Sequence, residues 1–553
     1  MAKDLVRVTF LGGLGEIGRN CLALEQDGRI VVVDAGLMFP EPTMYGVDLI
    51  LPDFRWLIER RDRVDAIVLT HGHEDHTGSL RYLVKDVNVP IYGSALTLGF
   101  ARHRLTEARV AKDLTFIEVA DGEHRTIGPF EVEFIPVTHS VPSANALAFH
   151  TKVGVVVHSG DFKLDLTPID GRRTDVARLA ALGDAGVALL LADSTNAEEP
   201  GFTASERSVG VALRRIFLER PQRRMVVACF ASHIHRVQQI IDVAKEQHRK
   251  IALMGRSMDS NVKLARKLHL LKVETSDFIA PEHIDRFTPG EVCVICTGSQ
   301  GEPLAALTKL SRGEDRFMRV GADDTVILSS HPIPGNEWTV GRVIDDLHRA
   351  GTEVIDSSQE PVHASGHARQ GELRMFHQLL RPKNFVPVHG EYRHMVHHAD
   401  LAISMGLKDK HVVICEDGDQ IEVTADGIRR SGQIPAGFHY IDGSAGDLDE
   451  RPLEERRMLA EFGVLLISAG VDKAGGVISQ PVRVTARGWF DGESDRQLIA
   501  EVTNEVREAL QSALAEGDRD EVSINKVAQR TAGRLLGQRF RRQPVVLAAI
   551  VVL

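Results

Sequence analysis

Thr70-His71-Gly72-His73-Glu74-Asp75-His76 is the stretch that decides the fold of this chain. It follows an apolar run at residues 66–69, which predicts a buried strand, and we expect a helix to begin after Gly78. The histidines then lie in a loop at the carboxyl end of a strand, the usual place for a site in an α/β protein. Because histidine is scarce and densely spaced here, a merely polar loop is the weaker interpretation.

Four potential metal ligands stand within six residues of this stretch, and they cannot all reach one ion without strain. His71 and His73 can turn to one centre, and Asp75 and His76 to a second one. Imidazole combined with carboxylate favours Zn²⁺ or Mn²⁺ over Mg²⁺ or Ca²⁺.

Other polar residues follow apolar, strand-like runs in the same way. His139 follows the run 132–137, Asp161 follows 153–158, and Asp193 follows 189–192. A lone residue of this kind is most often a cap or a turn, but several at equivalent strand ends favour one shared site. His389 follows residues 386–388, but it comes 228 positions after Asp161, so a large segment is inserted between them.

The inserted segment, residues 208–369, alternates strands, polar loops and helices, which predicts a parallel α/β domain. Its loops at 231–236 and 363–367 each precede a helix, and helix N-termini with small polar residues bind anions. The alternative for the second loop is a Ser365 cap flanked by two exposed histidines.

Composition narrows the class of protein. The net charge of -11 argues against wholesale binding of nucleic acid, although a local basic channel is compatible with it. Five scattered cysteines do not form a disulfide framework. The start of the chain has no apolar signal region, and the longest apolar run, residues 545–553, is too short for a bilayer, so we expect a cytoplasmic protein.

The glycines at 13, 15 and 18 match a dinucleotide fingerprint, but a hairpin pattern follows them, so we reject NAD binding.

The H-x-H-x-D-H stretch resembles the metallo-β-lactamase superfamily. Asp193, the H-x-S-G-H loop at 363–367 and His389 resemble the motifs of its β-CASP subgroup, whose characterised branches act on nucleic acid. The segments 231–236, 255–258 and 296–303 narrow the resemblance to the bacterial ribonuclease J family. The fold this implies is α/β: a metallo-β-lactamase αββα sandwich with an inserted β-CASP α/β domain and a small C-terminal α+β domain. The expected limits are 1–207 and 370–430 for the sandwich, 208–369 for the insert, 431–450 for a linker and 451–553 for the C-terminal domain.

The resemblance also assigns roles to residues. His71, His73 and His139 would hold one metal ion, Asp75, His76 and His389 a second, and Asp161 would bridge them, while Asp34 would support the histidine loop. His76 is thereby also a catalytic residue. His367 and Asp193 are both candidates for the general acid, with His367 ranked first because the pKa of histidine lies near neutrality; the alternative for Asp193 is that it orients a ligand histidine. The residues expected to hold substrate phosphates are Ser232, His233, Ile234, His235, His363, Ala364, Ser365, Gly366 and His367.

The implied activity is a two-metal ribonuclease that leaves 5′-phosphate products, a 5′→3′ exonuclease with endonuclease activity in mRNA decay and rRNA maturation. We expect two divalent ions, Zn²⁺ before Mn²⁺, an RNA substrate preferably with a 5′-monophosphate end, and a homodimer or larger homo-oligomer. The alternatives are a β-CASP DNA-repair nuclease and a non-catalytic RNA-binding scaffold. Cleavage of matched RNA and DNA substrates distinguishes the ribonuclease from the DNA-repair nuclease. Metal analysis of the purified protein distinguishes it from the non-catalytic scaffold.

Overall fold

The computed structural model describes residues 4–302, 304–333, 336–443, 446–489, 494–541 and 543–552 of the chain. Pro303, the last residue of the 296–303 segment, lies outside these residues. The chain divides into two compact units. The first contains Met1–Phe39 and Leu49–His439, and the second contains Pro40–Asp48 and Tyr440–Leu553. None of the described helices is both long enough and apolar enough to cross a lipid bilayer.

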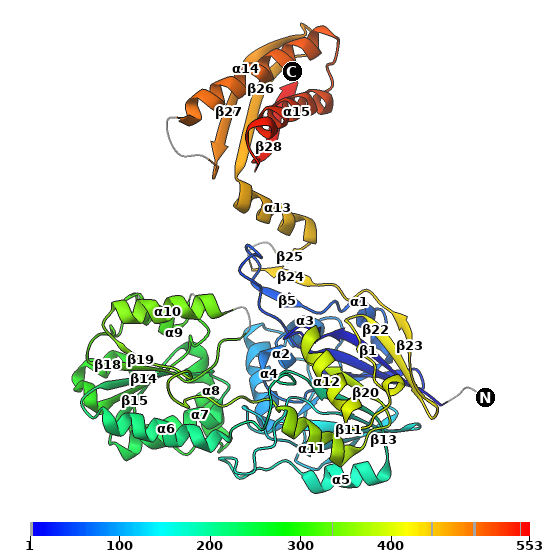
Figure 1. Ribbon diagram of the computed structural model, residues 1–553, viewed down its shortest axis with the longest axis vertical. Coiled ribbons are helices and arrows are strands. Elements are labelled where there is room, and N and C mark those ends of the chain that lie inside the picture. The colour runs from blue at the N-terminus through cyan, green and yellow to red at the C-terminus, as the bar shows by residue number, and fades with distance from the viewer. Residues whose placement is uncertain are drawn as a thin grey trace. The chain divides into compact units, whose positions relative to one another are not determined.

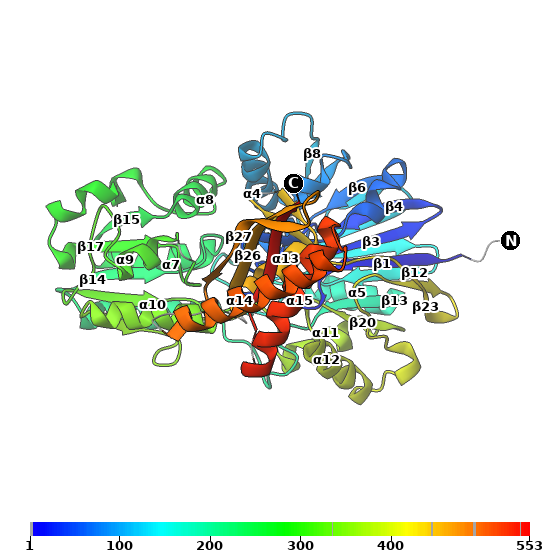
Figure 2. The same cartoon turned by 90° about the horizontal axis from the view of Figure 1, so that it is seen from above.

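Eight strands form the first sheet of the larger unit, in the order β23-β22-β1-β3-β4-β6-β7-β8. The strands from β4 to β8 run parallel, and β4 is a continuous run of isoleucine and valine, as expected for a parallel strand with both faces covered. Figure 2 shows β1, β3, β4 and β6 side by side. The strands are β1 (Val6–Gly12), β3 (Cys21–Gln26), β4 (Arg29–Val33), β6 (Val64–Val68), β7 (Ile91–Gly93), β8 (Phe116–Glu118), β22 (Asp419–Thr424) and β23 (Gly427–Gln433).

Six strands form the second sheet, in the order β20-β13-β12-β11-β10-β9. The strands β9 to β12 form an antiparallel meander, and β13 and β20 then pair in parallel with β12 and with each other. The chain therefore returns to this sheet through β20 after the long insert. The strands are β9 (His124–Ile127), β10 (Phe130–Pro136), β11 (Asn145–Thr151), β12 (Gly154–His158), β13 (Val187–Asp193) and β20 (Phe385–Val388).

The two sheets face each other across an apolar core that includes Phe10, Phe130 and Phe149. Trp56 and Leu105 belong to the helical layer on the outer face of the first sheet, and other helices cover the second sheet (Figure 1). This arrangement is the predicted αββα sandwich. The covering helices are α1 (Arg55–Ile58), α3 (Leu80–Leu83) and α4 (Ala95–Glu107) on the first sheet, and α5 (Val176–Ala185), α11 (Gln370–Leu380) and α12 (Tyr392–Ser404) on the second.

The histidine stretch itself is partly helical, which the sequence did not predict. Helix α3 begins after Gly78 as expected, but a shorter helix, α2 (Glu74–Thr77), begins inside the stretch. Glu74 and Asp75 lie in the first turn of α2, where negative side chains are stabilised by the exposed backbone N–H groups. The glycines at 13, 15 and 18 precede strand β3 rather than a helix, which agrees with the rejection of NAD binding.

The inserted segment forms its own sheet, in the order β16-β15-β17-β14-β18-β19. All of its pairs are parallel, as predicted. Apolar side chains of α6, α7 and α8 cover one face, and those of α9 and α10 cover the other. The strands are β14 (Arg224–Ala228), β15 (Lys250–Met254), β16 (Phe278–Ile279), β17 (Val292–Cys296), β18 (Asp324–Leu328) and β19 (Glu353–Ile355). The helices are α6 (Glu206–Glu219), α7 (Ile234–Glu246), α8 (Arg256–Lys267), α9 (Ala306–Ser311) and α10 (Glu337–Arg349).

The smaller unit is an α+β fold. Its sheet has the order β27-β26-β28, and the helices α14 and α15 supply the apolar side chains that cover it. The sheet strands are β26 (Val464–Asp472), β27 (Val477–Arg487) and β28 (Val545–Val552), and a strand pair, β24 (His439–Asp442) and β25 (Gly446–Leu448), precedes them. The helices are α13 (Glu450–Phe462), α14 (Ser494–Ala515) and α15 (Glu521–Arg539).

Candidate metal centre and catalytic site

Strand ends from both sheets of the sandwich supply the candidate site. Strand β6 leads into His71, β10 into His139, β12 into Asp161 and β20 into His389. In the second sheet β10, β12 and β20 run in the same direction, so their carboxyl ends lie at one edge of the sheet, which explains how residues far apart in sequence meet. The seven predicted ligands fall into two groups that share Asp161, and the ligand atoms of each group lie within 4.8 Å of one another.

The first group contains three histidines. His73 Nδ1 lies 3.1 Å from His71 Nε2 and 3.2 Å from His139 Nε2. The Oδ2 atom of Asp161 lies 3.5 Å from His71 Nε2 and 3.8 Å from His139 Nε2. One nitrogen of each ring therefore points to a common centre.

The second group contains two histidines and two carboxylates. His389 Nε2 lies 3.3 Å from Asp75 Oδ2, and His76 Nε2 lies 3.6 Å from the same oxygen. The Oδ1 atom of Asp161 lies 3.2 Å from His76 Nε2, and its Oδ2 atom lies 3.8 Å from His389 Nε2. Asp161 thus presents an oxygen to each group.

The outward nitrogens of four histidines are each next to a hydrogen-bond acceptor. The Nδ1 atom of His76 lies 2.7 Å from Asp34 Oδ2, and that of His139 lies 2.8 Å from the Gly366 carbonyl oxygen. A hydrogen on Nδ1 leaves a lone pair on Nε2, the nitrogen that points into the group.

Two threonines complete this outer layer. The Thr70 hydroxyl donates to Asp34 at 2.7 Å and lies 3.1 Å from His71 Nδ1. The Thr195 hydroxyl donates to Asp193 at 2.7 Å and lies 2.7 Å from His389 Nδ1. Each hydroxyl, having donated its hydrogen to a carboxylate, can accept one from the ring. Such partners fix the tautomer and orientation of metal-binding histidines.

The residues fit a pair of divalent ions. Both carboxylate oxygens of Asp161 are buried without a hydrogen-bond partner, although five histidines and one further carboxylate, Asp75, complete the two groups. An ionised carboxylate in the interior is costly unless it faces positive charge, and bound cations would supply that charge. Zn²⁺ ligands at about 2.0–2.1 Å in a tetrahedron lie roughly 3.4 Å apart, close to the nitrogen spacing found here.

Burial keeps the histidines of the first group in the neutral form that binds a metal ion. It lowers the pKa of His73 to about 4 and the pKa of His71 and His139 well below the usual range of histidine. These rings are therefore neutral near pH ~7 and offer lone pairs. In the second group, the carboxylate of Asp161 outweighs burial, so the pKa of His389 is raised to about 10 and that of His76 lies well above its usual range. The positive charge of His389 and His76 in turn outweighs burial at Asp161 and holds the pKa of that carboxyl well below its usual range.

His367 and Asp193 form a pair beside the two groups. His367 Nδ1 lies 2.8 Å from Asp193 Oδ2, and its ring stacks on that of His389 with centroids 5.3 Å apart. Asp193 is buried, and its other oxygen accepts hydrogen bonds from the backbone N–H and hydroxyl of Thr195. The side chain of His367 is 20% exposed, so of the two it is the one that a substrate can reach.

The loop before α11 approaches the first group closely. A Cβ atom on Gly366 would lie 2.6 Å from His139 Cε1, so only glycine allows its carbonyl to reach the ring. Ser365 Oγ accepts hydrogen bonds from the Asn196 side chain at 2.9 Å and from the His367 N–H at 3.2 Å. Ala364 packs into the core of the insert, and the buried His363 Nδ1 has no hydrogen-bond partner.

The N-terminus of α11 does not offer the free N–H groups that the sequence predicted for anion binding. The N–H groups of Gln370 and Gly371 donate to the carbonyls of Glu199 and Gly201, and the N–H of Arg369 donates to Glu372. The segment after β13 packs against this helix, a long-range contact that local sequence does not reveal. That expectation for α11 was wrong.

The loop before α7 differs from the loop before α11 because the start of its helix is more open. No side chain caps the helix, and Ser232 and His235 are only partly buried beside its first turn. His235 Nε2 lies 3.0 Å from Asp170 Oδ2. Ile234 is fully buried in the core of the insert, and the buried His233 Nε2 lies 3.5 Å from Glu206. The side chains of Ser232 and His235 are thus the accessible ones in this loop.

Three residues at the site were not singled out from the sequence. Thr70 is the first residue of the histidine stretch and immediately precedes His71, and Thr195 follows Asp193 by two positions. Asn20 donates to the Asp75 carbonyl at 3.1 Å, and its amide nitrogen lies 3.1 Å from His76 Nε2. The position of the threonines beside predicted ligands was a usable signal, whereas Asn20 reaches the site only through the fold.

Four family models match the chain. The metallo-beta-lactamase superfamily matches residues 14–199, and the beta-CASP domain of ribonuclease J matches residues 222–347. The Zn-dependent metallo-hydrolase RNA specificity domain matches residues 358–415, and the ribonuclease J C-terminal domain matches residues 452–553.

Curated relatives are similar over the full length. Ribonuclease J of Mycolicibacterium smegmatis is 41% identical over 553 residues, covering 100% of this chain and 98% of the relative. Ribonuclease J of Mycobacterium tuberculosis is 40% identical over 99% of this chain and 97% of its own. Ribonuclease J 1 of Streptococcus pyogenes is 38% identical over the same shares.

One solved structure supports the fold alone. The crystal structure of a protein of unknown function from Enterococcus faecalis V583 superposes with a TM-score of 0.54 at 17% identity. The match covers 76% of this chain and 100% of that one.

Proposed function

Since the chain belongs to the ribonuclease J family, a branch of the metallo-β-lactamase superfamily, we propose that it hydrolyses RNA phosphodiester bonds at a two-metal centre. The observation that carries this proposal is the Asp161 carboxylate, buried without a hydrogen-bond donor between two groups of inward-facing nitrogens. His71, His73 and His139 would hold one ion, Asp75, His76 and His389 would hold the other, and Asp161 would be shared between them. Asp34 keeps His76 in its ligand tautomer.

Two divalent ions at this centre, when bound, activate water at neutral pH and clamp the scissile phosphate for in-line attack. We take Zn²⁺ as the metal, with Mn²⁺ as the alternative, because imidazole nitrogens outnumber carboxylates. The ribose 2′-hydroxyl takes no part, so the products carry a 5′-phosphate.

His367 serves as the general acid in this proposal. Asp193 accepts a hydrogen bond from Nδ1–H and raises the pKa of His367 against the effect of burial, so the ring can be imidazolium and carry a second proton on Nε2 for the departing 3′-oxygen. Asp193 is the positioning residue, because it is buried and its oxygens already accept hydrogen bonds from His367 and Thr195. These contacts support His367 rather than Asp193 as the general acid, the ranking that the sequence suggested.

The 5′ end of the RNA binds in the loops before α7 and α11. The uncapped N-terminus of α7, with Ser232 and His235 beside it, supports the binding of one phosphate group. Ser365 and His367 lie in the other loop, next to the first metal group. We therefore assign 5′→3′ exonuclease activity with a preference for a 5′-monophosphate, endonuclease activity in addition, and roles in mRNA decay and rRNA maturation.

The remaining assignments concern the whole chain. We propose the domain limits given from the sequence, a homodimer or larger homo-oligomer, and a cytoplasmic location. All five cysteines are free and buried, which supports a reducing compartment.

The test compares one sequence as 5′- and 3′-labelled RNA and as DNA, with the purified protein and its His76→Ala variant. We expect cleavage of RNA only, 5′-phosphate products, loss of cleavage in the variant, and about two metal ions per wild-type chain. Faster cleavage of DNA would favour a DNA-repair nuclease, and RNA binding without bound metal or cleavage would favour a scaffold.

A further inference from the structure

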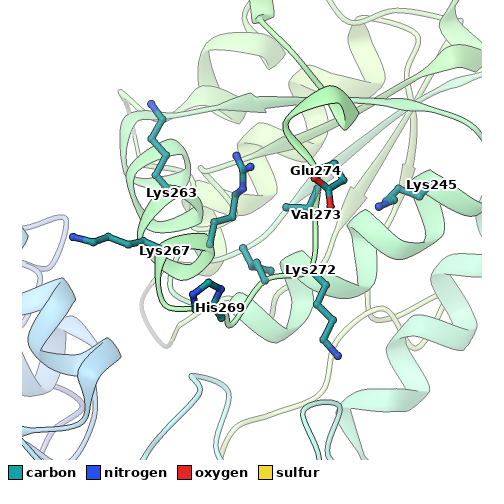
Figure 3. Close-up of a pocket in the computed structure, with 9 residues that line it drawn as sticks. Lys245, Lys263, Lys267, His269, Lys272, Val273 and Glu274 are labelled. Carbon is teal, nitrogen blue, oxygen red and sulfur yellow. The ribbon is translucent and has the colours of Figure 1, made fainter.

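A basic pocket lies in the inserted domain, away from the metal ligands in sequence. Its volume is about 620 Å³, and the end of α8, the loop that follows it and the end of α7 form its walls (Figure 3). The basic side chains that line it are Lys245, Lys263, Arg266, Lys267, His269 and Lys272. Glu274 is the single carboxylate of the lining. Five permanent cations against one anion make this pocket strongly positive in a chain whose net charge is -11.

Some of these cations already have carboxylate partners. Lys245 Nζ lies 2.9 Å from Asp277, and Lys263 Nζ lies 2.6 Å from Asp259. The exposed Lys267 and Lys272 have no ion pair with any residue that the structure describes. Cations gathered without counter-charges repel one another, so an anion bound between them is stabilised.

The fold holds Lys272 in place. Helix α8 ends in a turn in which His269 adopts a left-handed conformation (φ +59°) and the Leu270 N–H bonds back to the Ala265 carbonyl. Leu271 is buried in the apolar core and anchors the loop. The Gln238 side chain of α7 accepts a hydrogen bond from the Lys272 N–H at 2.7 Å and donates one to its carbonyl at 3.3 Å.

We propose that this pocket is a second RNA-binding site that holds backbone phosphates of the substrate beyond the catalytic centre. The inference rests on the proposed function, since it needs RNA as the substrate. The lining offers cations and, apart from the His269 imidazole, no aromatic ring on which a base could stack. Such a site holds the backbone without reading the base sequence.

The geometry of α8 relates the pocket to the catalytic loops. Asn261 in α8 donates to the Ala231 carbonyl at 3.1 Å, so the helix is tied to the loop that carries Ser232. Asn261 is the sixth residue of this 12-residue helix, so the pocket at the carboxyl end lies about 9 Å farther along the helix axis. A dinucleotide held at Ser232 would not span that distance at about 3.4 Å per nucleotide, whereas a long RNA would, so the pocket favours long substrates.

The test uses the full-length protein with Lys267→Gln and Lys272→Gln combined. A matched control combines Lys408→Gln and Lys410→Gln, two exposed lysines outside the pocket. Binding of a short RNA of about 2 nucleotides and a long one of about 30 is measured by fluorescence anisotropy over a range of salt concentrations, without added metal. Cleavage of both RNAs is followed in parallel.

For the pocket variant we expect about tenfold weaker binding of the long RNA at low salt, unchanged binding of the short one, and a salt slope reduced by about 1.4 for two lost phosphate contacts. The control should match the wild type. Inorganic tripolyphosphate should weaken long-RNA binding to the wild type more than to the pocket variant. As a second variant without a charge change, Gln238→Ala should also weaken binding of the long RNA.

Wild-type affinity and salt slope in the pocket variant would overturn the proposal, and so would equal losses for short and long RNA. A different result would count against the proposed ribonuclease function: the wild type would bind the long RNA without cleaving it. The two outcomes are separable because binding and cleavage are measured independently.

Discussion

His367 Nδ1 lies 2.8 Å from the Oδ2 atom of the buried Asp193, so the two candidates for the general acid are bonded to each other. A carboxylate can only accept this hydrogen bond, so the imidazole donates it and keeps Nε2 for the substrate. We predict that His367→Gln lowers kcat by about 10²–10⁴, the usual contribution of a positioned acid, with metal content unchanged. Single-turnover cleavage and metal analysis check both points.

Asp193→Asn distinguishes the acid from its positioning residue. An RNA whose 3′-oxygen leaving group is replaced by sulfur needs no proton, so it should restore most of the activity of His367→Gln. It should restore less in Asp193→Asn, because Asp193 also contacts His389 and Thr195. If the His367→Gln variant lost as much activity on the sulfur substrate as on the oxygen substrate, His367 would not be the general acid.

His76→Ala should abolish cleavage while RNA binding survives. The side chain is buried, points its Nε2 at Asp161 and is not among the residues assigned to phosphates. Asp34→Ala, which removes the hydrogen-bond partner of both His76 Nδ1 and Thr70, should cost about 10–100-fold in metal affinity. Cleavage assays, filter binding and metal titration test the two variants, His76→Ala and Asp34→Ala. Turnover at the wild-type rate by His76→Ala would disprove the site assignment.

His389 should coordinate the second ion despite its distance along the chain. Strand β20 pairs in parallel with β13, and this pairing places His389 next to Asp75. An anomalous-scattering map of crystals grown with Zn²⁺ should show density between these two side chains, and His389→Ala should retain about one ion per chain. A second ion bound without His389 would refute this arrangement.

The grouping of the seven predicted ligands could be predicted from sequence because each of them follows an apolar strand. His139 and Asp161 stand directly after strands of one sheet, so topology alone brings them together. The contacts of Asn20 and the hydrogen bonds that occupy the N-terminus of α11 could not be read, because they depend on loop positions set by packing between distant segments. The basic pocket near Lys272 was missed for the same reason.

The stability of the larger unit should depend on pH through Asp417. Burial, with the negative charge of Glu16 nearby, raises the pKa of Asp417 to about 7 although Arg19 lies 2.7 Å away. The folded chain then binds a proton that the unfolded chain, with a pKa near ~3.9, has released. The free energy of unfolding therefore decreases as pH rises from about 4 to about 7 and changes little from this group above that.

Urea denaturation over this pH range measures the effect. Asp417→Asn should flatten the curve relative to the wild type, whereas Asp86→Asn, at an exposed position, should leave its shape unchanged. A parallel pH profile for Asp417→Asn and the wild type would show that Asp417 stays ionised beside Arg19.

A preference for a 5′-monophosphate end over a triphosphate or a hydroxyl is the last prediction. The Ile234 N–H donates to the Ser232 carbonyl, and the next two N–H groups of α7, those of His235 and Arg236, suit a single phosphate group together with the Ser232 hydroxyl. A triphosphate adds charge and bulk, and a hydroxyl end leaves donors unpaired, which costs ~1–3 kcal/mol, or roughly five- to a hundredfold in binding. Initial rates on one RNA with each of the three ends measure the preference, and Ser232→Ala should reduce it. Ser365→Ala should lower the rates on all three ends together, because Ser365 also accepts the His367 N–H. If the wild type cleaved all three RNAs equally fast, these loops would hold only internal phosphates and the enzyme would act solely as an endonuclease.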